Sequence, residues 1–190
     1  MDYFPAVKEE KLWLSEFFLK HIISQGNYAI MHPGASWKYK RWKAENFRII
    51  GKYLYDRYKL RTILIGTTDE MELGEKICLG NKEIFINVIG QCSLRESILL
   101  INNSKIAICN DSGPMHIAAQ SNIPTIGLMG SSDIDKFGPV GKNVLLFHKK
   151  LECYPCAQVI CKYPLLPCVD LNTPEEIIKG IQYFLDPVEK

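Results

Sequence analysis

The stretch that decides the fold of this chain runs from Ile106 to Ala119 and reads IAICNDSGPMHIAA. Its first four residues form a short, β-branched apolar run, which is typical of a buried parallel strand. The Ser-Gly-Pro turn that follows predicts the start of a helix, with Pro114 at the first helical position, where a missing N–H costs nothing. A strand, a tight turn and a helix N-terminus together present free N–H groups and a positive dipole end, which favours an anion such as a diphosphate.

This stretch contains four candidate residues for such a site: Asp111, Ser112, Gly113 and His116. His116 lies in the first predicted turn, where its ring can donate a hydrogen bond to a phosphate. A second interpretation is open, because Asp and Ser before a helix are ordinary caps and a lone histidine is more often structural than a ligand.

The composition indicates one globular α/β domain over residues 1–190. Hydrophobic residues make up 47% and charged residues 23% of the 190 residues, and the formal net charge is only +2. This balance gives no reason to expect nucleic-acid binding. The apolar runs are the length of strands, and the N-terminus lacks the pattern of a signal peptide. We therefore expect no membrane span and a cytoplasmic location, with peripheral contact to the inner membrane as an alternative.

Predicted strands and helices alternate about six times along the chain. Strands are predicted at 28–31, 62–65, 84–88, 106–109, 125–129 and 143–147, and helices at 8–24, 44–58 and 70–79 and from Ser93, Pro114 and Thr173. Such alternation predicts a Rossmann-like, doubly wound α/β fold with a mostly parallel six-stranded sheet. Right-handed crossovers then bring the turns after the strands to one edge of the sheet, where folds of this class bind ligands.

Three strand-end segments are expected to converge at that edge: residues 32–42, 66–70 and 111–116. In the first, Ser36 and Lys40 suit a pyrophosphate, because a hydroxyl and an ammonium group neutralise its charge. A solvated basic loop is the alternative. In the second, Glu70 suits the hydroxyls of a ribose, although a carboxylate there also stabilises a helix N-terminus.

The two common nucleotide-binding motifs are missing from the sequence. Neither G-x-G-x-x-G after the first strand nor G-x-x-x-x-G-K-S/T occurs. An NAD-dependent dehydrogenase and a P-loop nucleotidase are therefore disfavoured.

Several short motifs occur together in the order found in one enzyme family. They are HPGAS from His32, KRW from Lys40, the Gly66–Glu70 turn, Gly90 with Ser93-Leu94 and Glu96, NDSGPMHIAA from Asn110, PTIGLMG from Pro124, and the late cysteines. Over nearly the whole chain, this set resembles the bacterial ADP-heptose:lipopolysaccharide heptosyltransferases, the ninth sequence family of glycosyltransferases.

The resemblance implies the C-terminal, donor-binding half of a two-domain GT-B glycosyltransferase, with the N-terminal acceptor domain absent. It implies that Ser36 and Lys40 lie near the donor phosphates and that Glu70 holds the adenosine ribose. It also implies that residues 111–113 and His116 form the diphosphate turn. Lys40 and His116 would then stabilise the departing diphosphate as heptose passes, with inversion, to the lipopolysaccharide inner core.

The resemblance also implies that no metal cofactor is required and that the general base, a carboxylate of the acceptor domain, has no counterpart here. We therefore expect the chain alone to bind ADP-heptose and to transfer little or no sugar. Two alternatives remain open. The first is a nucleotide-sugar binding module that is not catalytic or that serves as one subunit of a split transferase. The second is an interaction domain stabilised by zinc. Trp37, Tyr39 and Trp42 are expected on the surface, where they suit an interface with the missing domain or with a second copy of the chain.

Four of the seven cysteines, Cys153, Cys156, Cys161 and Cys168, lie within sixteen positions. Four thiolates can hold a tetrahedral zinc ion, and the first pair has the usual C-x2-C spacing. The second pair is more widely spaced than in common zinc motifs. Structural zinc, reduced thiols and a disulfide all remain open, and metal here would stabilise a loop without taking part in catalysis.

Overall fold

A computed structural model describes residues 5–156 and 160–186 of the chain. Six strands form one sheet in the order β3-β2-β1-β4-β5-β6, and every neighbouring pair is parallel. The strands are β1 (Tyr28–His32), β2 (Arg61–Leu64), β3 (Phe85–Asn87), β4 (Ile106–Asn110), β5 (Thr125–Met129) and β6 (Val144–His148). The predicted Rossmann-like α/β fold is confirmed, and the sheet is parallel throughout.

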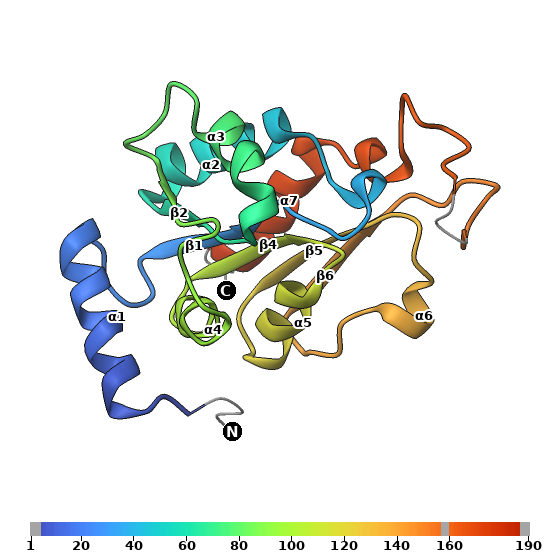
Figure 1. Ribbon diagram of the computed structural model, residues 1–190. Helices are drawn as coiled ribbons and strands as arrows, with labels where there is room; N and C mark the ends of the chain where they lie inside the picture. Colours follow the sequence, from blue (N-terminus) through green and yellow to red (C-terminus); the bar gives the residue numbers. More distant parts are fainter. Residues whose placement is uncertain (1–4, 157–159, 187–190) are drawn as a thin grey trace.

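Helices cover both faces of the sheet (Figure 1). One face carries α2 (Ala44–Tyr58), α3 (Met71–Cys78) and α7 (Pro174–Leu185), and the other carries α1 (Lys8–His21), α4 (Leu94–Asn102) and α5 (Gly113–Gln120). The short helix α6 (Ile134–Phe137) precedes β6 and was not predicted.

The two hydrophobic cores follow from the alternation of side chains along the buried strands. In β1, Ala29 and Met31 pack with α2 and α7, whereas Tyr28 and Ile30 pack with α1, α4 and α5. All five residues of β4 are buried, as expected for a central strand covered on both faces. The sheet therefore holds the ends of β1 and β4 on a rigid base.

Helix starts follow local sequence rules. Ser93 and Thr173 cap α4 and α7 by accepting hydrogen bonds from the N–H groups of Glu96 and Glu176, and the two glutamates complete capping boxes. These predicted boundaries are confirmed.

In the part of the chain that the structure describes, we find no helix with the length and apolar character needed to cross a membrane.

Candidate functional site

The centre of the sheet contains a topological switch point between β1 and β4. From β1 the chain proceeds outward to β2 and β3, and from β4 it proceeds in the opposite direction to β5 and β6. The loops after β1 and β4 therefore diverge, leaving a crevice at their carboxyl ends, where doubly wound sheets bind ligands. His32 ends β1 and Asn110 ends β4.

Asn110 joins the two loops at this point. Its side chain is fully buried; Nδ2 donates to the carbonyl of Pro33 at 2.6 Å, and Oδ1 accepts from the N–H of Trp42 at 3.3 Å. The indole Nε1 of Trp42 donates in turn to the carbonyl of Asn172 at 2.9 Å. These buried bonds fix the segment from Pro33 to Trp42, which carries Ser36 and Lys40.

His32 connects the other two loops. Its Nε2 lies 3.5 Å from Oε2 of Glu70, and its Nδ1 lies 2.8 Å from Oγ of Ser112. His32 is only 6% exposed, so these contacts are shielded from water. A single ring thus lies between a carboxylate after β2 and a hydroxyl after β4.

The carboxylate of Glu70 is buried close to two glycines. Its Oε2 accepts from the N–H of Thr67 at 2.9 Å. A Cβ at Gly34 would lie 1.7 Å from Oε1, and one at Gly66 would lie 2.6 Å from Oε2. Burial raises the pKa of Glu70, but the bonds from His32 and Thr67 and the charge of Arg41 outweigh it and leave the pKa below its usual value. Glu70 is therefore an ionised group in a fixed position, and it also serves the helix-terminal role that the sequence left open.

Lys40 and Asp111 form a largely buried ion pair across the crevice. Nζ of Lys40 lies 2.9 Å from Oδ2 of Asp111, and the two side chains are 11% and 8% exposed. The neighbouring Arg41 donates through Nε to the carbonyl of Ala35 at 2.9 Å and holds its own loop. The ammonium group of Lys40 is thus placed at the end of β4 instead of extending into solvent.

The N-terminus of α5 differs from those of α4 and α7. The hydroxyl of Ser112 donates to the carbonyl of Asn110 at 2.9 Å and, within the described residues, makes no capping bond to the helix. Gly113 and His116 on the first turn are exposed, as is Ser36 on the opposite loop. The structure therefore brings Lys40, Glu70, Asp111 and Ser112 into one network and leaves Ser36, Gly113 and His116 at its solvent edge.

A cavity of about 370 Å³ opens beside this network. It lies over the ends of β1 and β2 and reaches the starts of α4 and α5. It is lined by His32, Ile65, Gly66, Thr67, Thr68, Gly90, Cys92, Leu94, Ser97 and Pro114. Its size and mixed apolar and polar walls suit a small organic ligand.

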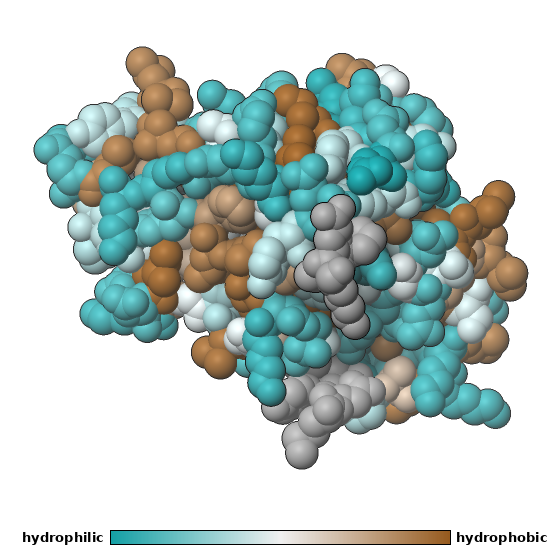
Figure 2. All heavy atoms as spheres, turned by 180° about the vertical axis from the view of Figure 1, so that it is seen from behind, coloured by the Kyte–Doolittle hydropathy of each residue, from teal (hydrophilic) through white to brown (hydrophobic). Residues whose placement is uncertain are grey.

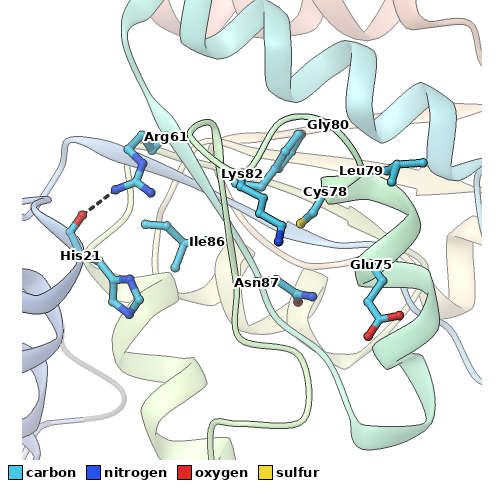
Figure 3. A pocket seen from close by; sticks show the side chains of 10 residues that line it. His21, Arg61, Glu75, Cys78, Leu79, Gly80, Lys82, Ile86 and Asn87 are labelled. Atoms are coloured by element: carbon cyan, nitrogen blue, oxygen red, sulfur yellow. Dashed lines mark hydrogen bonds between the residues drawn. The ribbon is translucent and has the colours of Figure 1, made fainter.

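A second cavity, of about 540 Å³, lies at the edge strand β3 and is larger (Figure 3). There Arg61 donates to the carbonyl of His21 at 2.5 Å, and none of the predicted site residues lines this cavity. We place the site at the smaller cavity, because His32 in its wall contacts Glu70 after β2 and Ser112 after β4. The walls of the larger cavity are His21, Arg61, Glu75, Cys78, Leu79, Gly80, Lys82, Phe85, Ile86 and Asn87.

The four late cysteines line one small cavity of about 40 Å³, together with Trp37 and Tyr39. All seven cysteines are free thiols. Across residues 5–156 and 160–186, no group of three or more His, Cys, Asp or Glu side chains is arranged to hold a metal ion. The zinc hypothesis gains no support from this arrangement.

Two features of the site differ from the sequence analysis. Trp42 is 1% exposed and packs in the core beside Phe47, so the prediction that it lies on the surface was wrong; its indole is needed to anchor the loop. His32 and Asn110 were quoted only as parts of motifs, although they form the contacts that assemble the site. Their partners lie 38 to 80 positions away along the chain, and local sequence patterns carry no signal for such contacts.

Comparison with known proteins gives a consistent family. The family model "Glycosyltransferase family 9 (heptosyltransferase)" matches residues 6–166. Lipooligosaccharide heptosyltransferase 2 of Campylobacter jejuni subsp. jejuni serotype O:6 is 31% identical over 164 residues, which are 83% of this chain and 51% of that protein.

Solved structures agree on the fold. The glycosyl transferase family 9 protein from Veillonella parvula superposes with a TM-score of 0.83 at 23% identity, over 95% of this chain and 52% of that one. The E. coli ADP-heptose lps heptosyltransferase II gives a TM-score of 0.76, also at 23% identity, with the same coverage of both chains. The chain spans about half the length of the relatives that it matches.

Proposed function

The chain belongs to glycosyltransferase family 9, the heptosyltransferases, and on that premise we propose that it binds an ADP-heptose donor at the switch point between β1 and β4. The observation that carries this proposal is the convergence of three loops on one crevice. Lys40 is paired with Asp111 at 2.9 Å, and His32 lies between Glu70 and Ser112. The network thus places cationic and anionic groups beside a cavity of about 370 Å³.

The diphosphate would lie between the loop after β1 and the first turn of α5. Lys40 would share its ammonium group between Asp111 and the phosphate oxygens, and the exposed His116, Ser36 and N–H groups of α5 would supply further donors. As the bond between the sugar and the diphosphate breaks, negative charge grows on the leaving group. Donors already fixed in place stabilise that charge more than they stabilise the bound donor, which lowers the barrier.

The nucleoside would occupy the cavity beside the diphosphate. Glu70, ionised and fixed by Thr67 and His32, is adjacent to Gly66 and Thr67 in the cavity wall and would accept hydrogen bonds from the ribose hydroxyls. The described partners of Glu70 both contact Oε2, so Oε1 is the oxygen proposed for the ribose.

We further propose that the chain supplies the donor-binding half of an inverting heptosyltransferase of lipopolysaccharide biosynthesis. The acceptor-binding residues and the general base would come from the region of the relatives that this chain does not match. A non-catalytic nucleotide-sugar binding module is the second candidate. The chain matches only about half the length of its relatives, and the residues described here are those proposed to bind the donor.

A paired experiment tests this proposal. ADP-heptose is titrated into the chain while tryptophan fluorescence is followed, since Trp37 and Trp42 flank the Lys40 segment; ADP release is then measured with a lipopolysaccharide-core acceptor. We expect saturable binding and no ADP release above background. Release that depends on the acceptor would show that the chain carries its own base and would overturn the donor-only role. Absence of binding would overturn the site itself.

A further inference from the structure

We infer that His32 is a positioning residue that keeps both ends of the donor site in their binding arrangement, Glu70 through one ring nitrogen and Ser112 through the other. This inference rests on the proposed function and adds to it a role for His32, which lines the cavity and is inferred to act through Glu70 and Ser112. The two ring contacts, 3.5 Å to Glu70 and 2.8 Å to Ser112, are the basis for it.

The contact to Ser112 explains why α5 begins without a side-chain cap. Ser93 and Thr173 occupy the same position before α4 and α7, and both accept a hydrogen bond from their helix. Ser112 is chemically able to do so, yet its Oγ lies against Nδ1 of His32 and donates to the carbonyl of Asn110. In the first turn of α5, Pro114 has no N–H and Met115 donates to the carbonyl of Ser112 at 3.1 Å, so without a side-chain cap the N–H of Gly113 stays available to another acceptor.

The contact to Glu70 fixes the carboxylate on the other side of the ring. Glu70 and His32 are each 6% exposed, and the space that side chains at Gly34 and Gly66 would fill is occupied by the carboxylate. A buried carboxylate that lost this partner would keep only the N–H of Thr67 among its described hydrogen-bond partners. The orientation of the carboxylate would then be less well defined.

Two substitutions separate the two contacts. The amide of an asparagine side chain reaches the position of Nδ1, and that of a glutamine reaches the position of Nε2. His32→Asn therefore keeps the contact to Ser112 and loses that to Glu70, whereas His32→Gln does the reverse. An amide carries both a donor and an acceptor, so either tautomer of the histidine can be imitated.

The test measures affinities of the full chain for adenosine and for inorganic pyrophosphate by NMR titration. We expect His32→Gln to weaken pyrophosphate binding about tenfold and to leave adenosine binding within about twofold. We expect His32→Asn to show the opposite pattern. In Ser112→Ala, which has no hydroxyl to cap α5, the effect of His32→Gln on pyrophosphate should disappear.

Equal losses for both probes in both variants, or no loss in either, would overturn the positioning role and leave a structural one. His21→Gln and His21→Asn are matched controls, because this half-exposed histidine lies at the β3-edge cavity and away from the site.

The outcomes also separate the proposed function from the inference about His32. A wild-type chain that binds no ADP overturns the proposed function and with it this inference, whereas ADP binding without the crossed pattern overturns the inference alone.

Discussion

The switch point and the cysteine segment (described residues 151–156 and 160–168) both concentrate chemically reactive side chains. At the switch point these side chains bond to one another, whereas the four described thiols of the cysteine segment line one small cavity without a disulfide between them. At the switch point, Asn110, His32, Glu70 and Asp111 are between 0% and 8% exposed and bond across three loops. In the cysteine segment, Ile160 and Leu165 are 85% and 95% exposed, and the pair formed by Lys162 and Glu152 lies on the surface.

The difference is one of topology. The switch point takes its residues from the ends of adjacent parallel strands, which the sheet holds close together. The described residues of the cysteine segment, 151–156 and 160–168, lie between β6 and α7 and belong to no strand of the sheet (Figure 1). Closeness in sequence therefore does not by itself bring reactive side chains into contact. Side chains at the ends of neighbouring parallel strands are brought together by the fold.

The solvent-exposed face shown in Figure 2 carries hydrophobic groups scattered among hydrophilic ones, as is ordinary for a protein surface. The site is distinguished by its buried polar contacts, and the following predictions perturb them in turn.

The largest expected effect comes from adding one carbon atom at the switch point. In Gly34→Ala the new Cβ would lie 1.7 Å from Oε1 of Glu70, which His32 and Thr67 hold in place. We expect a loss of about 3 kcal/mol in the free energy of unfolding, at the upper end for overpacked sites, measured by urea denaturation. Gly113→Ala is the control, because its Cβ would meet nothing within 4 Å. Similar losses in both variants would contradict the close fit around Glu70.

Next in size is the loss of the cation. Lys40→Ala should weaken ADP binding by roughly 1.5–3 kcal/mol, the cost of a charge-assisted hydrogen bond, as measured by calorimetry. Lys38→Ala, two residues away and exposed, should change the affinity by less than about 0.5 kcal/mol. If the two lysines proved equivalent, the segment would be a solvated basic loop.

His116→Ala should have a smaller effect than Lys40→Ala, because His116 is exposed and its contribution competes with water. We expect a loss of about 0.5–1.5 kcal/mol in ADP binding, with Gln120→Ala at the other end of α5 as the control. An unchanged affinity in His116→Ala would remove this residue from the site.

The lowered pKa of Glu70 predicts a specific dependence of stability on pH. Because the folded state favours the ionised carboxylate, its contribution to stability is complete above the usual pKa near 4.5 and is lost as the pH falls through the lowered pKa. The stability difference between wild type and Glu70→Gln should therefore be constant from about pH 7 to 5 and shrink as the pH falls below about 4.5. Urea denaturation at several pH values measures it.

Glu75→Gln, an exposed carboxylate on α3, serves as the control for that series. A difference between wild type and Glu70→Gln that grew on acidification would contradict the assignment of Glu70 as the ionised partner of His32.

The smallest effect is expected in the cysteine segment. Because its four cysteines form no metal-binding arrangement among the described residues, EDTA should shift the melting temperature by less than about 2 °C, which is under ~1 kcal/mol for a domain of this size. The measurement is differential scanning calorimetry with metal analysis of the purified chain. Stoichiometric zinc and a large drop on chelation would restore the zinc hypothesis and weaken the contrast between the two regions.

The sequence predicted the elements and the meeting of the loops, because both follow from local patterns and from the rules of parallel sheets. Periodicity gave α2 and β5 with the observed bounds, and capping boxes gave the starts of α4 and α7. The network within the site was not predicted. Trp42 lies in a basic loop, which gives no local sign that its side chain is buried. Its indole instead donates to the carbonyl of Asn172, 130 positions away along the chain. His32 and Asn110 likewise depend on distant partners that no local pattern specifies.

The most direct test of the central claim is a calorimetric titration of the chain with ADP, UDP and GDP without added metal, repeated with Lys40→Ala. The account predicts saturable binding at one site that prefers ADP and weakens in Lys40→Ala. Absence of binding by all three nucleotides, or ADP binding that is unchanged in Lys40→Ala, would contradict a donor site at the switch point.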